Sequence, residues 1–78
     1  MLPPSLGDLI QLKVLDLGYN QIDRLPFEIT ALTKLDFLSV NYNSLVHVPP
    51  EIAVWIDTYS FDEEWRTTQQ SYHKREKR

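Results

Sequence analysis

Hydrophobic and polar positions recur along this chain at a fixed interval of 23 residues, the separation of Tyr19 from Tyr42. The segments GYNQIDRLP (18–26) and NYNSLVHVP (41–49) both carry Tyr-Asn, then an aliphatic residue two places later, then a closing proline. Self-similarity at an interval of roughly 20–50 residues indicates similar structural units stacked side by side. The pattern therefore predicts an array of short repeats.

Three rows follow from this interval. Row one covers residues 2–24, row two covers 25–47, and row three starts at 48 and keeps the pattern through 57. Leu15-x-Leu17 and its counterpart in row two alternate apolar and polar residues, which is the period of a half-buried strand. We therefore expect parallel strands near 13–17 and 36–40. The polar residues within these strands, which we expect to face solvent, are Asp16 and Ser39.

Between the predicted strands, leucine and isoleucine recur every third residue, a spacing that suits a short 3₁₀ or α turn. Proline cannot donate a hydrogen bond to a strand ladder, so Pro26 and Pro49 mark where the chain leaves the strand side. We expect such turns near residues 27–33 and 50–56, on the side opposite the strands.

The two full rows contain the motif L-x-x-L-x-L-x-x-N-x-L or a close variant. Its positions are Leu12, Leu15, Leu17, Asn20 and Ile22 in row one, and Leu35, Leu38, Val40, Asn43 and Leu45 in row two. The chain thus resembles the leucine-rich repeat family, and is most similar to intracellular 23-residue members such as the Ras-linked scaffold and plant Ras-group-related proteins. The resemblance implies an α/β repeat fold: a short solenoid with parallel strands on its concave face and 3₁₀ or α turns on its convex face.

Row three loses the motif after residue 57, because Arg66 stands where asparagine is expected. Ser60 and Glu63 form an S-x-x-E capping box, which favours a helix start. We expect a C-terminal capping helix from about 61 to 73. Its apolar face would consist of Phe61, Trp65, Thr68 and Tyr72. The chain then divides into leucine-rich repeats (1–59) and a capping helix with a basic tail (60–78).

The resemblance implies that Asn20 and Asn43 point inward and bond the backbone of each turn, as a structural ladder. The tyrosine before each asparagine is a different case, since tyrosine combines an apolar ring with a polar tip. We expect Tyr19 and Tyr42 to stack along the rim of the concave face, either as rim packing or as contact residues.

The concave positions provide the candidate partner-binding surface. Val14 and Phe37 are apolar where the repeat would expose them, which is more informative than an apolar residue in a core. The full candidate set is Lys13, Val14, Asp16, Tyr19, Asp36, Phe37, Ser39 and Tyr42.

No combination of residues indicates catalysis. His47 and His73 lack an accompanying nucleophile or metal-ligand spacing. Asp62, Glu63 and Glu64 are adjacent, and adjacent residues on a helix point in different directions. We therefore expect no enzymatic activity, no metal and no cofactor.

Composition bears on the class of protein and on its cellular compartment. The chain has 78 residues, enough for one domain, with a net charge of −3 and no cysteine. The negative charge disfavours a nucleic-acid-binding body, and the lack of cysteine favours a reducing compartment. The first residues lack the basic start of a signal peptide, and no apolar run approaches the ~20 residues of a membrane span. We expect a cytoplasmic protein, or a nuclear one if the basic tail is an import signal; its basic residues are Lys74, Arg75, Lys77 and Arg78.

These observations favour a non-catalytic module that binds a protein partner through its concave face, as in intracellular signalling. One alternative is a truncated isoform or fragment of a longer repeat protein without separate activity. Another is an adaptor that binds nucleic acid or an anionic membrane through its basic tail. The strand of row one has no upstream neighbour in the sequence, and an open strand edge favours self-association.

Overall fold

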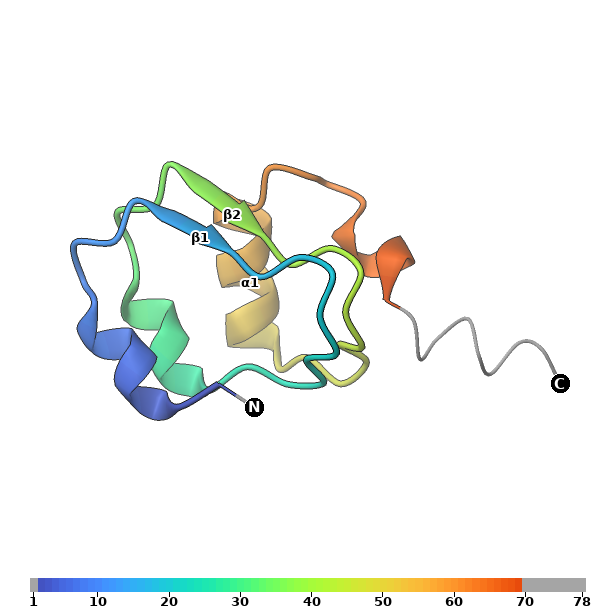
Figure 1. Cartoon of the computed structure of the whole chain (residues 1–78), viewed down its shortest axis with the longest axis horizontal. Helices are drawn as coiled ribbons and strands as arrows, with labels where there is room; N and C mark the ends of the chain where they lie inside the picture. Colours follow the sequence, from blue (N-terminus) through green and yellow to red (C-terminus); the bar gives the residue numbers. More distant parts are fainter. Residues whose placement is uncertain (1, 70–78) are drawn as a thin grey trace, which may run out of the picture.

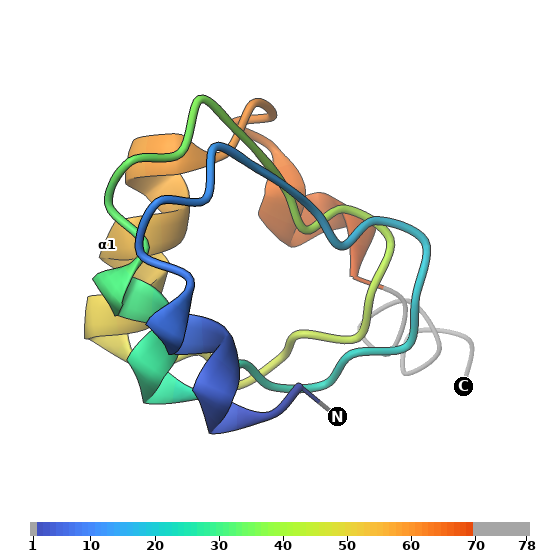
Figure 2. The same ribbon diagram turned by 60° about the vertical axis from the view of Figure 1, so that its left-hand side comes forward.

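The computed structural model describes residues 2–69, in which the strands lie on one side of a coiled backbone and the first three helices on the other (Figure 1). Turning the molecule shows the three N-terminal helices side by side, away from the strands (Figure 2). In chain order the elements are the 3₁₀ helix η1 (Pro4–Asp8), strand β1 (Val14–Asp16), the 3₁₀ helix η2 (Phe27–Ala31), strand β2 (Phe37–Ser39), helix α1 (Pro50–Tyr59) and the 3₁₀ helix η3 (Trp65–Thr68).

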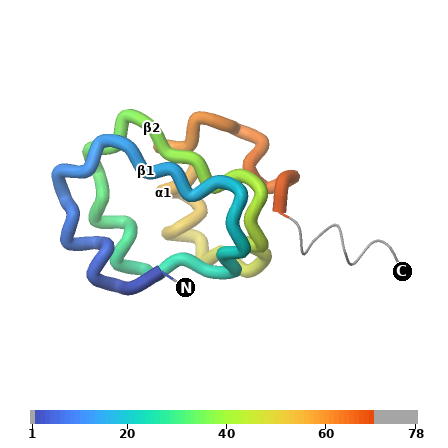
Figure 3. The backbone as a smooth tube through the Cα atoms, in the orientation of Figure 1, coloured from blue at the N-terminus to red at the C-terminus, as the bar shows by residue number. Residues whose placement is uncertain are grey.

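The two strands pair in parallel, with Val14 opposite Phe37 and Asp16 opposite Ser39. This register equals the 23-residue interval of the sequence, so the predicted parallel strands are confirmed. Backbone bonds continue the pairing past the strand ends, where the Leu17 amide donates to the Ser39 carbonyl at 2.9 Å. The backbone tube shows rows one and two following each other closely along this stretch (Figure 3).

The helices on the other side each begin directly after a proline with extended backbone, namely Pro3, Pro26 and Pro49. Proline fixes φ near −65° and has no amide hydrogen, so it ends strand pairing and suits the start of a helix. The turns predicted near 27–33 and 50–56 are confirmed by η2 and α1. The second turn is longer than expected, since α1 continues to Tyr59.

Helix α1 packs against row two through side chains spaced three and four residues apart, which are Ile52, Trp55 and Ile56. The Trp55 indole Nε1 donates to the Leu32 carbonyl at 2.8 Å, and the Tyr59 hydroxyl donates to the Thr33 carbonyl at 3.0 Å. These bonds fix α1 against the segment that follows η2. At 10 residues α1 is the longest helix within residues 2–69, and none of the helices there is long and apolar enough to cross a membrane.

The core lies in row two, which row one and α1 cover from two sides. Its buried side chains are Leu25, Ile29, Leu32, Leu35, Leu38, Val40 and Leu45. The corresponding leucines of row one are only partly buried, because no segment within residues 2–69 covers their other side. Leu9 and Ile10 are 50% and 51% exposed. We call this uncovered side the row-one face.

Gly7 allows η1 to approach row two closely. A Cβ atom at this position would overlap the carbonyl oxygen of Glu28. Glycine is therefore required here by contact with the backbone, the situation in which absence of a side chain has structural value.

The helix expected over 61–73 is not formed in its described part. Ser60 forms a parallel bridge with Leu38, and the Phe61 amide donates to the Leu38 carbonyl at 2.9 Å. The Ser60 hydroxyl bonds the backbone of Asp62, not that of Glu63, so the capping box is absent. The exposed edge of β2 supplies backbone groups that need partners, and pairing with them takes precedence over the helical pattern. Only η3 is helical here, and residues 70–73 lie outside the described part.

Candidate protein-binding surface

The strand side of the molecule carries an apolar column at its beginning. Val14 is 59% exposed and lies beside Phe37 in the paired register. The Phe37 ring stacks on that of Phe61, with centroids 5.2 Å apart and planes inclined by 21°. Sequence reasoning placed Phe61 on a helix over the last repeat. The bridge at Ser60 places it beside the strands instead, where it extends the column.

The predicted tyrosine stack is confirmed at the other end of the strands. The rings of Tyr19 and Tyr42 have centroids 4.6 Å apart and planes inclined by 17°. Tyr19 is 80% exposed, so one face of the stack is open to solvent. The two rings occupy the same position in successive rows, and the register of the strands brings them together.

Both tyrosines adopt the left-handed backbone conformation, with φ of 59° at Tyr19 and 61° at Tyr42. This conformation is unfavourable for a bulky residue and persists only where the surroundings impose it. The Tyr19 amide donates to the Asn41 carbonyl at 3.0 Å, and the Tyr42 amide donates to the Thr68 hydroxyl at 3.1 Å. Each turn is therefore held by the row that follows it.

A shallow depression of about 490 Å³ lies between the two aromatic pairs, and we call it the aromatic-rimmed hollow. It is lined by Asp16, Gly18, Tyr19, Phe37, Ser39, Asn41, Tyr42, Phe61 and Asp62. Of these residues, Gly18, Asn41, Phe61 and Asp62 were not among the predicted contacts. Asn41 lies at the strand exit directly before Tyr42, and this position was a signal that sequence reasoning could have used.

Ser39 was expected to face solvent, and this expectation is wrong. Its side chain is only 6% exposed, because it lies at the floor of the aromatic-rimmed hollow beside Gly18. The other polar strand residue, Asp16, is exposed as expected and its Oδ1 accepts the Gly18 amide at 3.0 Å.

Lys13 and Asp36 lie just before the strands, outside the hollow. The Lys13 carbonyl accepts the amides of both Asp36 and Phe37, at 2.7 and 3.1 Å. Both charged side chains are exposed. They flank the phenylalanine end of the surface.

The asparagine ladder is confirmed at Asn43. This side chain has no exposed surface, its Oδ1 accepts the Ile22 amide at 3.1 Å, and its Nδ2 donates to the Leu17 and Val40 carbonyls at 2.8 and 3.0 Å. The expectation that Asn20 points inward is wrong: it is exposed and bonds only carbonyls of its own row, those of Leu17 and Gly18. Asn43 therefore connects two rows, whereas Asn20 closes only its own turn.

Gln69 provides the next rung of this ladder, which sequence reasoning missed. Its Oε1 accepts the Leu45 amide at 2.9 Å, and its Nε2 donates to the Val40 and Trp65 carbonyls at 3.2 and 2.7 Å. Leu45 and Val40 are the row-two counterparts of the residues that Asn43 bonds in row one. Strict spacing pointed to Arg66, but the segment between the bridge at Ser60 and Gln69 contains the additional turn η3, which moves the third rung to residue 69.

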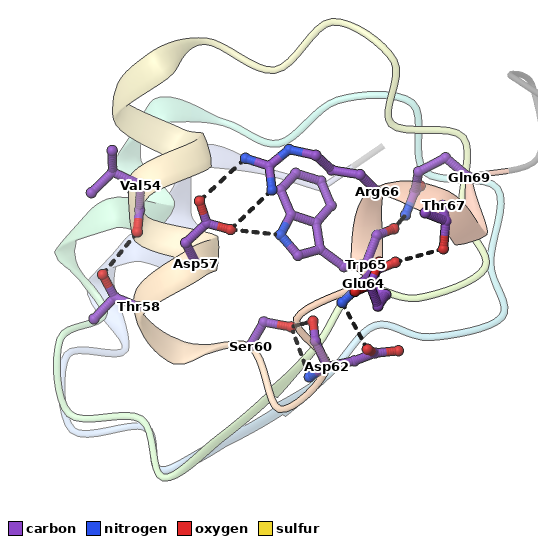
Figure 4. A network of polar contacts seen from close by, with 10 residues as sticks. All are labelled: Val54, Asp57, Thr58, Ser60, Asp62, Glu64, Trp65, Arg66, Thr67 and Gln69. Atoms are coloured by element: carbon purple, nitrogen blue, oxygen red, sulfur yellow. Dashed lines mark hydrogen bonds and ion pairs between the residues drawn. The ribbon is translucent and has the colours of Figure 1, made fainter.

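Trp65 and Arg66 form a polar cluster with Asp57 of α1 (Figure 4). The Arg66 guanidinium makes two bonds to the Asp57 carboxylate, at 3.1 and 3.2 Å, and lies 4.4 Å above the Trp65 ring centroid. The Trp65 Nε1 donates to Asp57 Oδ1 at 2.9 Å. The Arg66 hydrogen bonds, followed by that of Trp65, lower the pKa of Asp57. The cluster joins the last described turn to α1, and both carboxylate oxygens of Asp57 already accept hydrogen bonds within it.

Candidate catalytic positions do not converge within residues 2–69. His47 lies on the opposite loops, in a shallow depression with Asp23 and Arg24. The described residues contain no group of three or more histidine, cysteine or acidic side chains able to hold a metal ion. His73 and the basic tail, with Lys74, Arg75, Lys77 and Arg78, lie outside the described residues.

Comparison of the chain with family models, with curated proteins and with solved structures returned no match. A family assignment therefore rests on the repeat motif and its spacing.

Proposed function

We propose that this chain is a non-catalytic module that binds a protein partner through the strand side of a leucine-rich repeat solenoid. The observation that carries the proposal is the pair of aromatic stacks, Tyr19 on Tyr42 and Phe37 on Phe61, exposed on one side of the molecule. Aromatic side chains are enriched at protein interfaces, where they contribute a large share of the binding energy.

The proposed family membership is supported by the agreement between sequence and register. The motif repeats at 23 residues, and the strands pair at the same offset. The buried Asn43 bonds two successive rows, which is the role that the resemblance implies.

Rigidity supports binding by this surface. The tyrosines are fixed by strand pairing and by backbone bonds to the next row. Side chains that are already ordered lose little conformational entropy when a partner binds. The surface is small, and stable interfaces usually bury about 800 Å² on each partner. We therefore expect moderate affinity, or a partner that also contacts the flanking loops.

The test is a pull-down with the wild-type chain beside a Val14→Asp/Phe37→Asp variant. A matched control, Phe27→Asp/Val54→Asp, changes the same residue types at convex positions that are each 64% exposed. Circular dichroism establishes that all three chains are folded. We expect the strand-side variant to lose the partner and the control to keep it. A partner that both variants retain contradicts the proposal.

A second candidate, self-association through the row-one face, is favoured by the exposure of Leu9 and Ile10. Contiguous exposed apolar surface commonly marks an interaction site. An antiparallel arrangement of two β1 strands about a twofold axis would bury this face in both copies.

A further inference from the structure

The aromatic-rimmed hollow has rings at both ends and a polar floor between them. The Phe37–Phe61 stack lies where the strands begin, and the Tyr19–Tyr42 stack lies where they end. The chain from Phe37 to Tyr42 spans on the order of 15 Å at the rise of an extended strand. This length accommodates a long side chain lying along the floor, or a short extended peptide.

The floor offers hydrogen-bond acceptors in excess of donors. Asp16 uses Oδ1 to accept the Gly18 amide, and within residues 2–69 its Oδ2 has no partner. Asn41 is only 5% exposed and its Nδ2 donates to Asp62 Oδ2 at 3.0 Å, while its Oδ1 has no partner among the described residues. Asn41 Oδ1 is closed to solvent, so the acceptor that a ligand can reach from outside is Asp16 Oδ2, on an exposed side chain.

The hollow is also negatively charged. Asp16 of row one and Asp62 of the last described turn both line it. The ion pair found within residues 2–69 joins Arg66 to Asp57, so neither aspartate of the hollow has a cationic partner there. The faces of aromatic rings attract cations through their quadrupole. Carboxylates and ring faces thus both favour a positive ligand.

The chain itself shows how it binds such a group. Arg66 is held by a two-point contact with the Asp57 carboxylate while its guanidinium covers the Trp65 ring (Figure 4). The hollow repeats these ingredients, an aspartate beside exposed ring faces, and the described residues that line it include no arginine. A guanidinium is planar, donates up to five hydrogen bonds and stacks on aromatic rings, whereas an ammonium is a compact point charge.

The geometry points to an arginine side chain of the partner protein as the ligand of the aromatic-rimmed hollow, an inference that rests on the proposed function of the strand side as a binding surface. The guanidinium donates to Asp16 Oδ2 and lies against the tyrosine stack. The aliphatic stem of the arginine extends over Ser39 towards the phenylalanine stack. The partner therefore presents an exposed arginine at its contact with this hollow.

The experiment titrates the ¹⁵N-labelled full chain with the peptide Gly-Arg-Gly-Arg-Gly and follows amide shifts by NMR. A matched peptide carries citrulline, which keeps the shape of arginine and lacks its charge, and a third carries lysine. We expect the arginine peptide to shift the Gly18 and Asn41 amides and to bind about tenfold more tightly than the citrulline peptide, as for one charged hydrogen bond. Equal affinity for these two peptides overturns the inference, and equal affinity for the lysine peptide overturns the assignment to a guanidinium.

Asp16→Asn is the matched variant, because the amide oxygen still accepts the Gly18 amide while the charge is lost. We expect it to weaken binding of the arginine peptide about threefold or more. The control Asp23→Asn removes the same charge from the opposite loops and should leave binding unchanged. If Asp16→Asn and Asp23→Asn weaken binding of the arginine peptide equally, the effect comes from net charge and the inference is overturned. If Asp16→Asn alters the amide spectrum at large, the comparison of arginine and citrulline peptides on the wild-type chain decides, because it changes no residue of the protein.

The two proposals fail in different ways. Suppose that Val14→Asp/Phe37→Asp loses the protein partner but the arginine and citrulline peptides bind equally. The strand side is then still a protein-binding surface, and the arginine site is disproved. If that variant keeps the partner, the proposed function of the strand side as a binding surface is contradicted.

Discussion

Asn43 and Gln69 make equivalent hydrogen bonds on successive turns, although Gln69 lies three residues beyond the position that the repeat assigns. Each accepts a backbone amide of the preceding row, that of Ile22 or of Leu45, and donates to a carbonyl of that row. The backbone between Leu38 and this rung is longer in the last turn, because η3 precedes Gln69. The third rung is therefore defined by its bonds and not by its spacing.

Gln69→Ala should destabilise the fold by about 1–3 kcal/mol, because the buried Leu45 amide loses its acceptor. Gln69→Asn should recover little of this loss, since the shorter side chain cannot span both bonds. Urea unfolding followed by tryptophan fluorescence provides the measurement. Gln21→Ala, at an exposed position, is the control and should change stability by less than about 0.5 kcal/mol. Equal effects at 69 and 21 would contradict the role given to Gln69.

The two asparagines should differ in their effect. Asn43→Ala removes bonds to two rows from a side chain without exposed surface and should cost about 2–3 kcal/mol. Asn20→Ala removes two bonds from an exposed side chain and should cost no more than about 1 kcal/mol. The free energies of unfolding of both variants test this order. A larger loss for Asn20→Ala would mean that its turn, and not the connection between rows, limits stability.

Tyr19 should show an inverted order of glycine and alanine. At φ of 59°, glycine has no steric penalty whereas alanine does. Tyr19→Gly should therefore be about 1 kcal/mol more stable than Tyr19→Ala, the reverse of the usual preference. The same comparison at Lys13, in the extended segment before β1, supplies a control where alanine should be favoured. The midpoints of thermal unfolding of the four variants give the order of glycine and alanine at each position. A higher midpoint for Tyr19→Ala than for Tyr19→Gly contradicts the prediction.

Stability should fall in acid partly through Asp57. Hydrogen bonds from Arg66 and Trp65 lower the pKa of this carboxyl in the folded state below its ordinary value of about 3.9. The unfolded chain then binds the proton more readily, so the contribution is full above about pH 4 and is lost as pH falls through the folded pKa. Asp57→Asn should flatten this part of the profile of unfolding free energy between about pH 2 and 6. An unchanged slope would mean that other groups account for it.

Self-association should depend on the row-one face. A Leu9→Lys/Ile10→Lys variant should remain monomeric at concentrations where the wild type associates, because the added charges oppose burial of that face. Analytical ultracentrifugation over a concentration series measures the effect. Phe27→Lys/Val54→Lys, at convex positions that are more exposed than Leu9 and Ile10, is the control and should behave as the wild type does. A wild type that is monomeric throughout the series contradicts the proposal.

Sequence reasoning succeeded where one row predicts the next. The strands, the turns after Pro26 and Pro49 and the tyrosine stack all depend on residues that recur at the same offset, so the register transfers from one row to another. The bonds of Asn43 were predicted for the same reason. These features are local and periodic.

Sequence reasoning failed where the unpaired backbone edge of a strand competes with a helical pattern of side chains. Residues 61–73 have a good helical pattern, but the edge of β2 recruits Ser60 and Phe61 as a bridge. The burial of Ser39 was missed because it depends on Gly18, Asn41 and the phenylalanine pair, which come from three rows. Neither outcome is encoded in a single row.

The last described turn attaches to row two largely through main-chain atoms. Phe61 donates to the Leu38 carbonyl, Thr68 accepts the Tyr42 amide, and Gln69 bonds Val40 and Leu45. Main-chain groups are the same whatever side chains a repeat carries. These main-chain bonds can therefore end other arrays with this backbone path, provided that the repeat they join keeps apolar partners for Ile52, Trp55 and Ile56.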